Sequence, residues 1–397
     1  MDAQLGLRQN WKQFSLLVFI NAFVGGMIGM ERSIFPDFAT EVFGLESHAA
    51  MLGFIAAFGV SKAFTNYFTG RFANRFGRRN LLILGWILVL PVPVILNYAE
   101  VWSWIIFANI LLGISQGLTW SSTVVMKIDL VGDKNRGLAM GLNEFAGYLA
   151  VGLAAVGSAY LTSRFGIRPV PFWVMGGMGI LGFLFSFLVR DTHAFVKQEA
   201  GEKDIVEIRG VFWNTTWVDK SLSSVTQAGL VNNLNDGMIW GLLPVLLISR
   251  GFGLEEIGKI ASVYPILWGM GQLFTGKMAD HLSHKGMLFW GMLIQGLAIM
   301  GLIWVHSFES FVGLSVLLGL GTAVVYPTFM AAIAASSHPL QRAESLGTFR
   351  FWRDMGYAVG AVLSGVIADR FGVDYAVVSI SGLTLISSLI VKLRMSQ

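Results

Sequence analysis

The stretch RGLAMGLNEFAGYLAVGLAAVGSAYLTSRFG, residues 136–166, has a diverged second copy later in the chain. Residues 342–372 read RAESLGTFRFWRDMGYAVGAVLSGVIADRFG, and each stretch is long enough to cross a bilayer as a helix. The same offset of 206 positions relates FTGRFAN at 68–74 to FTGKMAD at 274–280. An offset shared by separate matches indicates an internal duplication. The identities within the two long stretches include Arg136, Gly141, Phe145, Ser158, Arg164, Phe165 and Gly166 with Arg342, Gly347, Phe351, Ser364, Arg370, Phe371 and Gly372.

The composition indicates a membrane protein. Of 397 residues, 54% are hydrophobic and only 13% are charged, whereas about a quarter of the residues of a soluble chain are charged. This excludes a soluble enzyme of ordinary composition and a disordered chain. The net charge of +4 is too small for a nucleic-acid-binding surface, so we expect no nucleic-acid partner. Because there is no cysteine and the histidines lack metal-ligand spacing, we predict no metal site, and no motif predicts a cofactor.

Twelve apolar runs are long enough to cross a bilayer. We therefore predict an all-α polytopic membrane protein with twelve transmembrane helices in two six-helix halves, residues 1–190 and 221–397, joined by a charged linker at 191–220. An even number of spans in each half gives the two copies the same orientation, which makes a parallel repeat. The predicted spans are 14–36, 48–69, 80–97, 102–126, 137–162, 170–189, 221–247, 256–275, 287–305, 309–334, 343–368 and 374–393.

Lysine and arginine residues between the spans fall mostly on one side of this topology, the side that holds both termini. Such an excess is typical of cytoplasmic loops. We therefore expect a multi-pass protein of the cell (inner) membrane with both termini in the cytoplasm.

The loop between the second and third predicted spans reads GRFANRFGRR, residues 70–79. Together with the two six-helix halves and the charged linker, it resembles the signature loop of the major facilitator superfamily, G-x-x-x-D-R-x-G-R-R. The resemblance covers the whole chain and implies a monomeric secondary transporter that works by alternating access. It departs at Asn74, where the family has an aspartate, although the second copy keeps the acid as Asp280. The arginines of the loop either help to close the cytoplasmic side or only set the topology. The gating residues that the resemblance implies are Arg71, Asn74, Arg75, Arg78, Arg136 and Asp280.

Charged residues within predicted spans are costly and mark candidate functional sites. Glu144 and Arg350 occupy equivalent positions of the repeat, so we expect them at the same depth on the two sides of the interface between the halves. Helical spacing places Arg350, Arg353 and Asp354 on one face. One interpretation is a static ion pair across the halves that acts as a gate, with Asp354 among its residues. The other is a direct role in substrate or proton coupling.

A second polar group lies in the seventh predicted span. Asn233, Asn235 and Asp236 interrupt an apolar run beside a glycine and a proline, which favours a substrate site at a broken helix. The alternative is hydrogen bonding between helices that holds the bundle together. Lys62, deep in the second span, needs a carboxylate partner, and Glu31 or Asp236 could supply it. Glu31 could instead be interfacial, because it lies near the end of its span.

These patterns predict a secondary transporter and not an enzyme. We expect a small organic solute to be exported in exchange for protons, with the basic residues neutralising or binding an anionic group. The alternatives are a proton-coupled or facilitative importer of an organic anion, and a lipid flippase of the same fold. The predicted proton-coupling residues are Glu31, Glu144 and Asp236. The predicted substrate-binding residues are Lys62, Trp120, Asn233, Asn235, Asp236, Tyr264, Trp268, Tyr326, Arg350 and Arg353.

Overall fold

The computed structural model describes residues 5–32, 34–47, 53–131, 136–192, 195, 210–279, 281–336 and 342–396. At positions 32, 36, 70–75, 136–139, 334 and 342–344 the description covers the backbone alone. Several predicted gating positions therefore lie outside the residues or side chains that are described. They are Arg71, Asn74, Arg75, Arg136 and Asp280.

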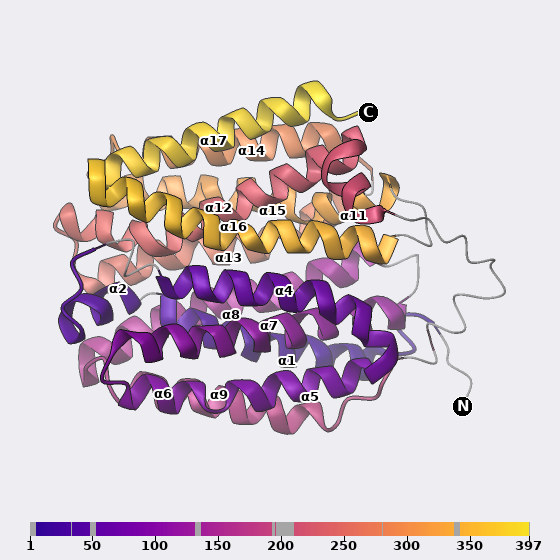
Figure 1. Cartoon of the computed structure of the whole chain (residues 1–397), viewed down its shortest axis with the longest axis horizontal. Helices are drawn as coiled ribbons and strands as arrows, with labels where there is room; N and C mark the ends of the chain where they lie inside the picture. Colours follow the sequence, from indigo (N-terminus) through magenta and orange to yellow (C-terminus); the bar gives the residue numbers. More distant parts are fainter. Residues whose placement is uncertain are drawn as a thin grey trace.

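Each predicted span contains helix among its described residues, and the described chain is organised as two bundles (Figure 1). The first bundle comprises α1 (Trp11–Arg32), α4 (Gly53–Phe76), α5 (Arg78–Val89), α6 (Val92–Tyr98), α7 (Trp102–Val131), α8 (Arg136–Phe165) and α9 (Val170–Ser186). The second comprises α12 (Lys220–Ser249), α13 (Leu254–Ala279), α14 (His284–Gly301), α15 (Phe308–Ser336), α16 (Arg342–Phe371) and α17 (Val373–Arg394). Shorter elements are α2 (Phe35–Asp37), a π-helical turn at Phe38–Val42, α11 (Val211–Trp213) and a π-helical turn at Asn214–Val218.

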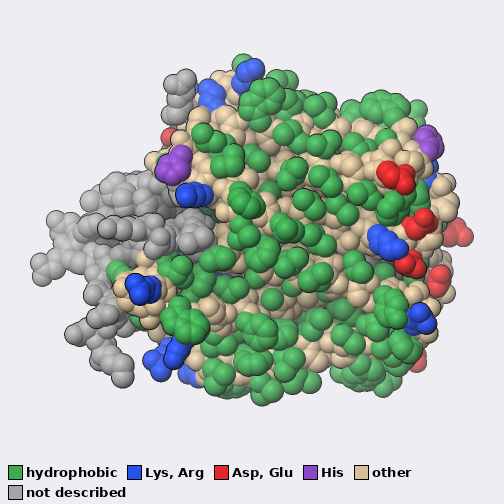
Figure 2. All heavy atoms as spheres, turned by 180° about the vertical axis from the view of Figure 1, so that it is seen from behind, with side chains coloured by type: hydrophobic (Ala, Val, Ile, Leu, Met, Phe, Trp, Pro, Cys, Tyr) green, Lys and Arg blue, Asp and Glu red, His purple; other side chains and the backbone are tan. Residues whose placement is uncertain are grey.

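The outer surface suits a lipid bilayer. Six segments in the described part of the chain are long and apolar enough to cross a membrane by length and composition alone: Trp11–Glu31, Arg78–Tyr98, Trp102–Val131, Met140–Phe165, Phe308–Ile333 and Val373–Arg394. The other predicted spans are helices too, but α9 has only 17 residues and α12 and α16 carry buried polar side chains. Figure 2 shows hydrophobic side chains over the middle of the visible face and charged ones near its two ends. This distribution fits helices whose sides meet lipid.

The two bundles meet along two helix pairs. α8 packs along α13, and α4 packs along α16. α1 begins and α17 ends at one end of the molecule, which we call the terminal face, and α2 lies at the opposite face (Figure 1). At the opposite face the bundles are joined by a hydrogen bond from Ser47 Oγ to Asp369 Oδ2, at 2.8 Å.

The repeat recurs as equivalent packing within each bundle. A Cβ atom at Gly113 would lie 2.5 Å from the carbonyl oxygen of Phe58, so α7 approaches α4 closely only because this residue is glycine. A Cβ atom at Gly319 would lie 2.8 Å from the carbonyl oxygen of Tyr264. Both partners of the second contact follow those of the first by 206 positions. Residues related by the sequence offset of 206 therefore make equivalent helix contacts in the two bundles.

Two helix boundaries differ from the prediction in ways that matter. The third span is interrupted between α5 and α6, where Pro91 precedes the first turn of α6. Proline lacks a backbone N–H and interrupts the hydrogen bonds of a helix. α7 continues to Val131, beyond the predicted end at residue 126. The longer helix carries Lys127 and Asp129 into the structured bundle.

Candidate functional site

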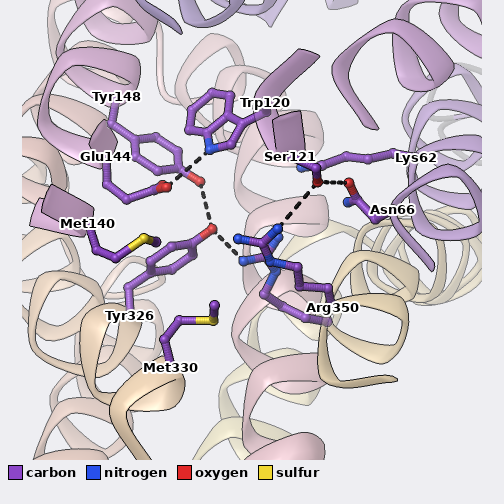
Figure 3. A pocket seen from close by; sticks show the side chains of 11 residues that line it. Lys62, Asn66, Trp120, Ser121, Met140, Glu144, Tyr148, Tyr326, Met330 and Arg350 are labelled. Carbon is purple, nitrogen blue, oxygen red and sulfur yellow. Dashed lines mark hydrogen bonds between the residues drawn. The ribbon is translucent and has the colours of Figure 1, made fainter. Parts of the chain in front are cut away.

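A pocket lies between the two bundles (Figure 3). α4, α7 and α8 line it from the first bundle, and α15 and α16 line it from the second. Six of the predicted site residues contribute to its wall, including Glu144 and Arg350. The lining residues are Lys62, Asn66, Trp120, Ser121, Met140, Glu144, Tyr148, Tyr326, Met330, Arg350 and Arg353.

Glu144 is a buried carboxylate with only one oxygen satisfied. Its Oε1 accepts hydrogen bonds from Trp120 Nε1 at 3.0 Å and from Asn143 Nδ2 at 2.6 Å. Its Oε2 is buried and has no hydrogen-bond partner among the described residues, and the whole residue is 2% exposed. An unpaired buried carboxylate oxygen is costly. This oxygen is therefore a site where a proton or a ligand would be stabilised.

Arg350 enters the same pocket from α16. Its Nη1 donates a hydrogen bond to Ser121 Oγ at 3.3 Å, and its Nε is buried without an acceptor among the described residues. No carboxylate oxygen of the described chain lies within 4.0 Å of its guanidinium. Glu144 and Arg350 thus face one pocket from opposite bundles, at equivalent positions of the repeat, without forming an ion pair in this conformation.

Asp354 is the centre of an ion cluster that joins the bundles. Its Oδ1 accepts hydrogen bonds from Arg353 Nε and Nη2 at 3.0 and 2.8 Å, and from Asn233 at 3.3 Å. Lys62 Nζ of α4 lies 3.6 Å from the same oxygen, and Asn66 of α4 donates to Oδ2. We call Lys62, Arg353 and Asp354 the ion cluster. The expectation that Glu31 or Asp236 pairs with Lys62 was wrong, because the packing of α4 against α16 places Asp354 nearer.

The counterpart of this cluster on the other side of the interface is aromatic. The positions equivalent to Lys62 and Asp354 are Trp268 and Tyr148. These two rings stack with centroids 3.5 Å apart and an angle of 26° between planes. The Tyr148 hydroxyl lies 3.5 Å from that of Tyr326, which accepts a hydrogen bond from Arg353 Nη1 at 2.6 Å. The interface is therefore ionic between α4 and α16 and aromatic between α8 and α13.

The polar group of α12 is divided between different surroundings. Asn233 reaches the ion cluster, and the Tyr264 hydroxyl donates to Asp236. Asn235 instead faces its own bundle, where it donates to Gln295 Oε1 at 3.1 Å and accepts from Thr384 at 2.6 Å. That placement favours a bundle-holding role for Asn235. Asn235, Asp236, Tyr264, Trp268 and Glu31, all of them buried, are not among the lining residues of the pocket.

Lys127 belongs to the surroundings of the site and was not predicted. It is 1% exposed and donates a hydrogen bond to the side-chain oxygen of Asn143, whose amide group donates to Glu144. Asn21 of α1 holds Asn143 from the other side, through its backbone oxygen at 2.9 Å. The signal that could have revealed Lys127 was the uninterrupted helical spacing past residue 126.

Arg78, a predicted gating residue, forms its ion pair within the first bundle. Its Nε lies 2.8 Å from Asp129 Oδ2 near the end of α7, and Thr192 also donates to this oxygen at 2.5 Å. The backbone N–H of Arg79 donates to Asp191 at 3.0 Å. The described part of the loop thus ties α5 to its own bundle at the terminal face.

Comparison with known proteins agrees with this architecture. The model of the Major Facilitator Superfamily matches residues 14–228 and, a second time, residues 225–396. The chain belongs to the major facilitator superfamily. It is therefore a multi-pass membrane protein and a secondary transporter, and not an enzyme.

Similar members of the superfamily include two bacterial proteins. The proton-coupled antiporter flippase LtaA of Staphylococcus haemolyticus is 24% identical over 389 residues, covering 92% of this chain and 88% of that protein. The multidrug resistance protein MdtG of Citrobacter koseri is 20% identical over 391 residues, covering 96% and 94%. The human organic anion transporter MFSD10 (TETRAN) has the same fold, with a TM-score of 0.74 at 16% identity over 96% of this chain and 99% of that one.

Proposed function

We propose that this transporter exports a small organic solute in exchange for protons by alternating access. The observation that carries the proposal is Glu144, a buried carboxylate whose Oε2 has no partner among the described residues and which lines the pocket between the bundles. A buried carboxylate whose negative charge has few partners is strongly stabilised when a proton or a positively polarised ligand binds to it. The names of two relatives, a proton-coupled antiporter and a multidrug resistance protein, support the same class of activity.

Competition for one oxygen atom would produce the exchange. A proton on Glu144 removes the negative charge that holds a donor group of the substrate, and a bound substrate excludes the proton. The transporter would then carry the substrate across in one change of conformation and the proton back in the reverse change. Asp236, which accepts a hydrogen bond from Tyr264, and the buried Glu31 are the further carboxylates that we assign to proton coupling.

The two bundles contact each other through the ion cluster on one side and through the stacked rings of Tyr148 and Trp268 on the other. Movement of one bundle against the other would change these two contacts differently. We propose that Asp354 acts as a gate, because opening the contact between α4 and α16 separates it from Lys62. We also propose that the terminal face is cytoplasmic, since lysine and arginine gather there, and that a monomer is the working unit. The proposed halves remain residues 1–190 and 221–397, with a linker at 191–220.

The test uses the protein reconstituted in liposomes with an imposed pH gradient. The probe is the compound that gives the largest thermal shift in a panel of organic cations, zwitterions, anions and neutral lipophiles. Glu144→Gln mimics the protonated acid, so it should abolish gradient-driven accumulation of that probe and also weaken exchange of labelled for unlabelled probe without a gradient. Glu309→Gln, at an exposed position, is the matched control and should behave as the unchanged protein. Asp236→Asn should also lose accumulation. Full accumulation in both Glu144→Gln and Asp236→Asn would overturn the proposal.

A further inference from the structure

Two buried atoms of opposite polarity remain without partners in one pocket. Glu144 Oε2 is an acceptor without a donor, and Arg350 Nε is a donor without an acceptor, among the described residues. The two side chains come from different bundles and lie on opposite sides of the pocket (Figure 3). Buried polar atoms in proteins are nearly always hydrogen-bonded, so two unpartnered atoms on residues that line one pocket are candidates for contact with a ligand.

The neighbouring charges already have partners and do not satisfy these two atoms. Arg353 is taken up by Asp354 and by the Tyr326 hydroxyl. Lys62 lies 3.6 Å from Asp354. Beside Glu144, Lys127 donates to Asn143 and not to the carboxylate. The pocket therefore offers a ligand one acidic and one basic group.

Between Glu144 and Arg350 the pocket is lined by aromatic and methionine side chains. Trp120 and Tyr148 have ring centroids 5.4 Å apart, and Tyr148 and Tyr326 have centroids 5.9 Å apart. Met140 and Met330 complete the lining. Aromatic rings and methionine side chains pack well against flat apolar groups of varied outline. This wall suits the apolar part of an organic molecule.

We propose that the substrate is zwitterionic, with a protonated nitrogen bound by Glu144 and an anionic group bound by Arg350. This inference rests on the proposed function, because it places the exported solute in the same pocket. A purely cationic solute would leave Arg350 unpaired and would be repelled by it. A purely anionic solute would do the same at Glu144. A molecule with both charges and an apolar ring can pair with Glu144 and Arg350 and also contact the aromatic wall.

The test compares binding within two matched sets of probes. The first set is L-phenylalanine, 3-phenylpropionate and 2-phenylethylamine, and the second is L-tryptophan, indole-3-propionate and tryptamine. Each set keeps the ring and removes one charge at a time. Binding to the purified protein is measured by thermal shift and by isothermal titration calorimetry, at neutral pH, where the amines of the probes are protonated and their carboxylates ionised. We expect the zwitterion of at least one set to bind about tenfold or more tightly than both of its analogues, since a hydrogen bond to a charged group is lost in each analogue.

Two variants assign the preference to individual side chains. Arg350→Gln should remove the advantage of the zwitterion over the amine and leave its advantage over the carboxylate. Glu144→Gln should do the reverse, and Glu309→Gln should change neither. A single-charge analogue that binds within threefold of the zwitterion in both sets would overturn the inference, as would no zwitterion preference in either set. These results would leave the proposed proton exchange standing, because that is tested by accumulation across a pH gradient.

Discussion

Replacing Asp354 by asparagine tests how the two bundles are held together. Asp354 is fully buried and accepts two hydrogen bonds from Arg353, while Lys62 of the other bundle lies 3.6 Å from the same oxygen. Asparagine keeps the size of the side chain but leaves two cations close together without a carboxylate. Removing one partner of a buried ion pair costs about 3–5 kcal/mol. We expect Asp354→Asn to lose about that much of the free energy of unfolding.

Lys62→Met should change the free energy of unfolding differently in the unchanged protein and in Asp354→Asn. In the unchanged protein Asp354 keeps both hydrogen bonds from Arg353, so the loss should be about 1 kcal/mol. In Asp354→Asn the same change removes an uncompensated buried cation and should restore stability. The coupling between the two changes should be about 0.5–3 kcal/mol, as for other residues in one charged network.

The assay is equilibrium unfolding of the purified protein in mixed micelles, followed by tryptophan fluorescence and circular dichroism as the denaturing detergent is increased. Tyr148→Phe, at the position equivalent to Asp354, is the matched control. It keeps the stack on Trp268 and loses only a 3.5 Å contact between hydroxyls, so it should cost less than about 1 kcal/mol. If Lys62→Met costs the same in both backgrounds, the ion cluster does not couple the bundles and the reasoning is wrong.

Three further predictions use the same unfolding assay. A Cβ at Gly59 would lie 2.7 and 2.9 Å from atoms of α16, so Gly59→Ala should cost about 1–3 kcal/mol; Gly157→Ala, with open space around its Cβ, should cost little, and equal losses would contradict the packing argument. Arg78→Met removes the ion pair with Asp129 and should destabilise more than Arg78→Met combined with Asp129→Asn; a larger loss in the double variant would contradict this. Burial, with repulsion from Glu41, raises the pKa of Asp37 to about 6. The folded state therefore holds this proton more tightly, and stability should fall as pH rises from about 4 to about 6. Asp37→Asn should remove that part of the pH dependence, and an unchanged pH profile would count against it.

The helices and their pairing into a repeat could be predicted because bilayer-spanning segments must be long and apolar. The same repeat placed Glu144 and Arg350 opposite one another before any contact was known, and the pocket contains both. Their role could not be decided in that way. Whether two opposite charges form an ion pair depends on differences of a few ångströms in the separation of the bundles. The hydropathy of the spans and the offset of the repeat do not determine that separation.

The errors have local causes. Lys127 was overlooked because the apolar run ends before it, while α7 continues through the charged residues with partners supplied by other helices. The partner of Lys62 was misjudged because it lies on α16, in the other half of the chain. The stack of Tyr148 on Trp268 was not foreseen either, since aromatic residues are common in every span. In each case the deciding contact joins segments far apart in sequence.

The two halves carry different residues at equivalent positions of the repeat, so neither half paired with a copy of itself would form the present pocket. A dimer of two first halves would set Glu144 against Glu144, and a dimer of two second halves would set Arg350 against Arg350. Lys62 would likewise meet the tyrosine that is equivalent to Asp354. An acid opposite a base therefore requires two copies that have diverged and stay together. A gene encoding either half alone, paired with itself, would keep the fold of one repeat but would not set an acid opposite a base in the pocket.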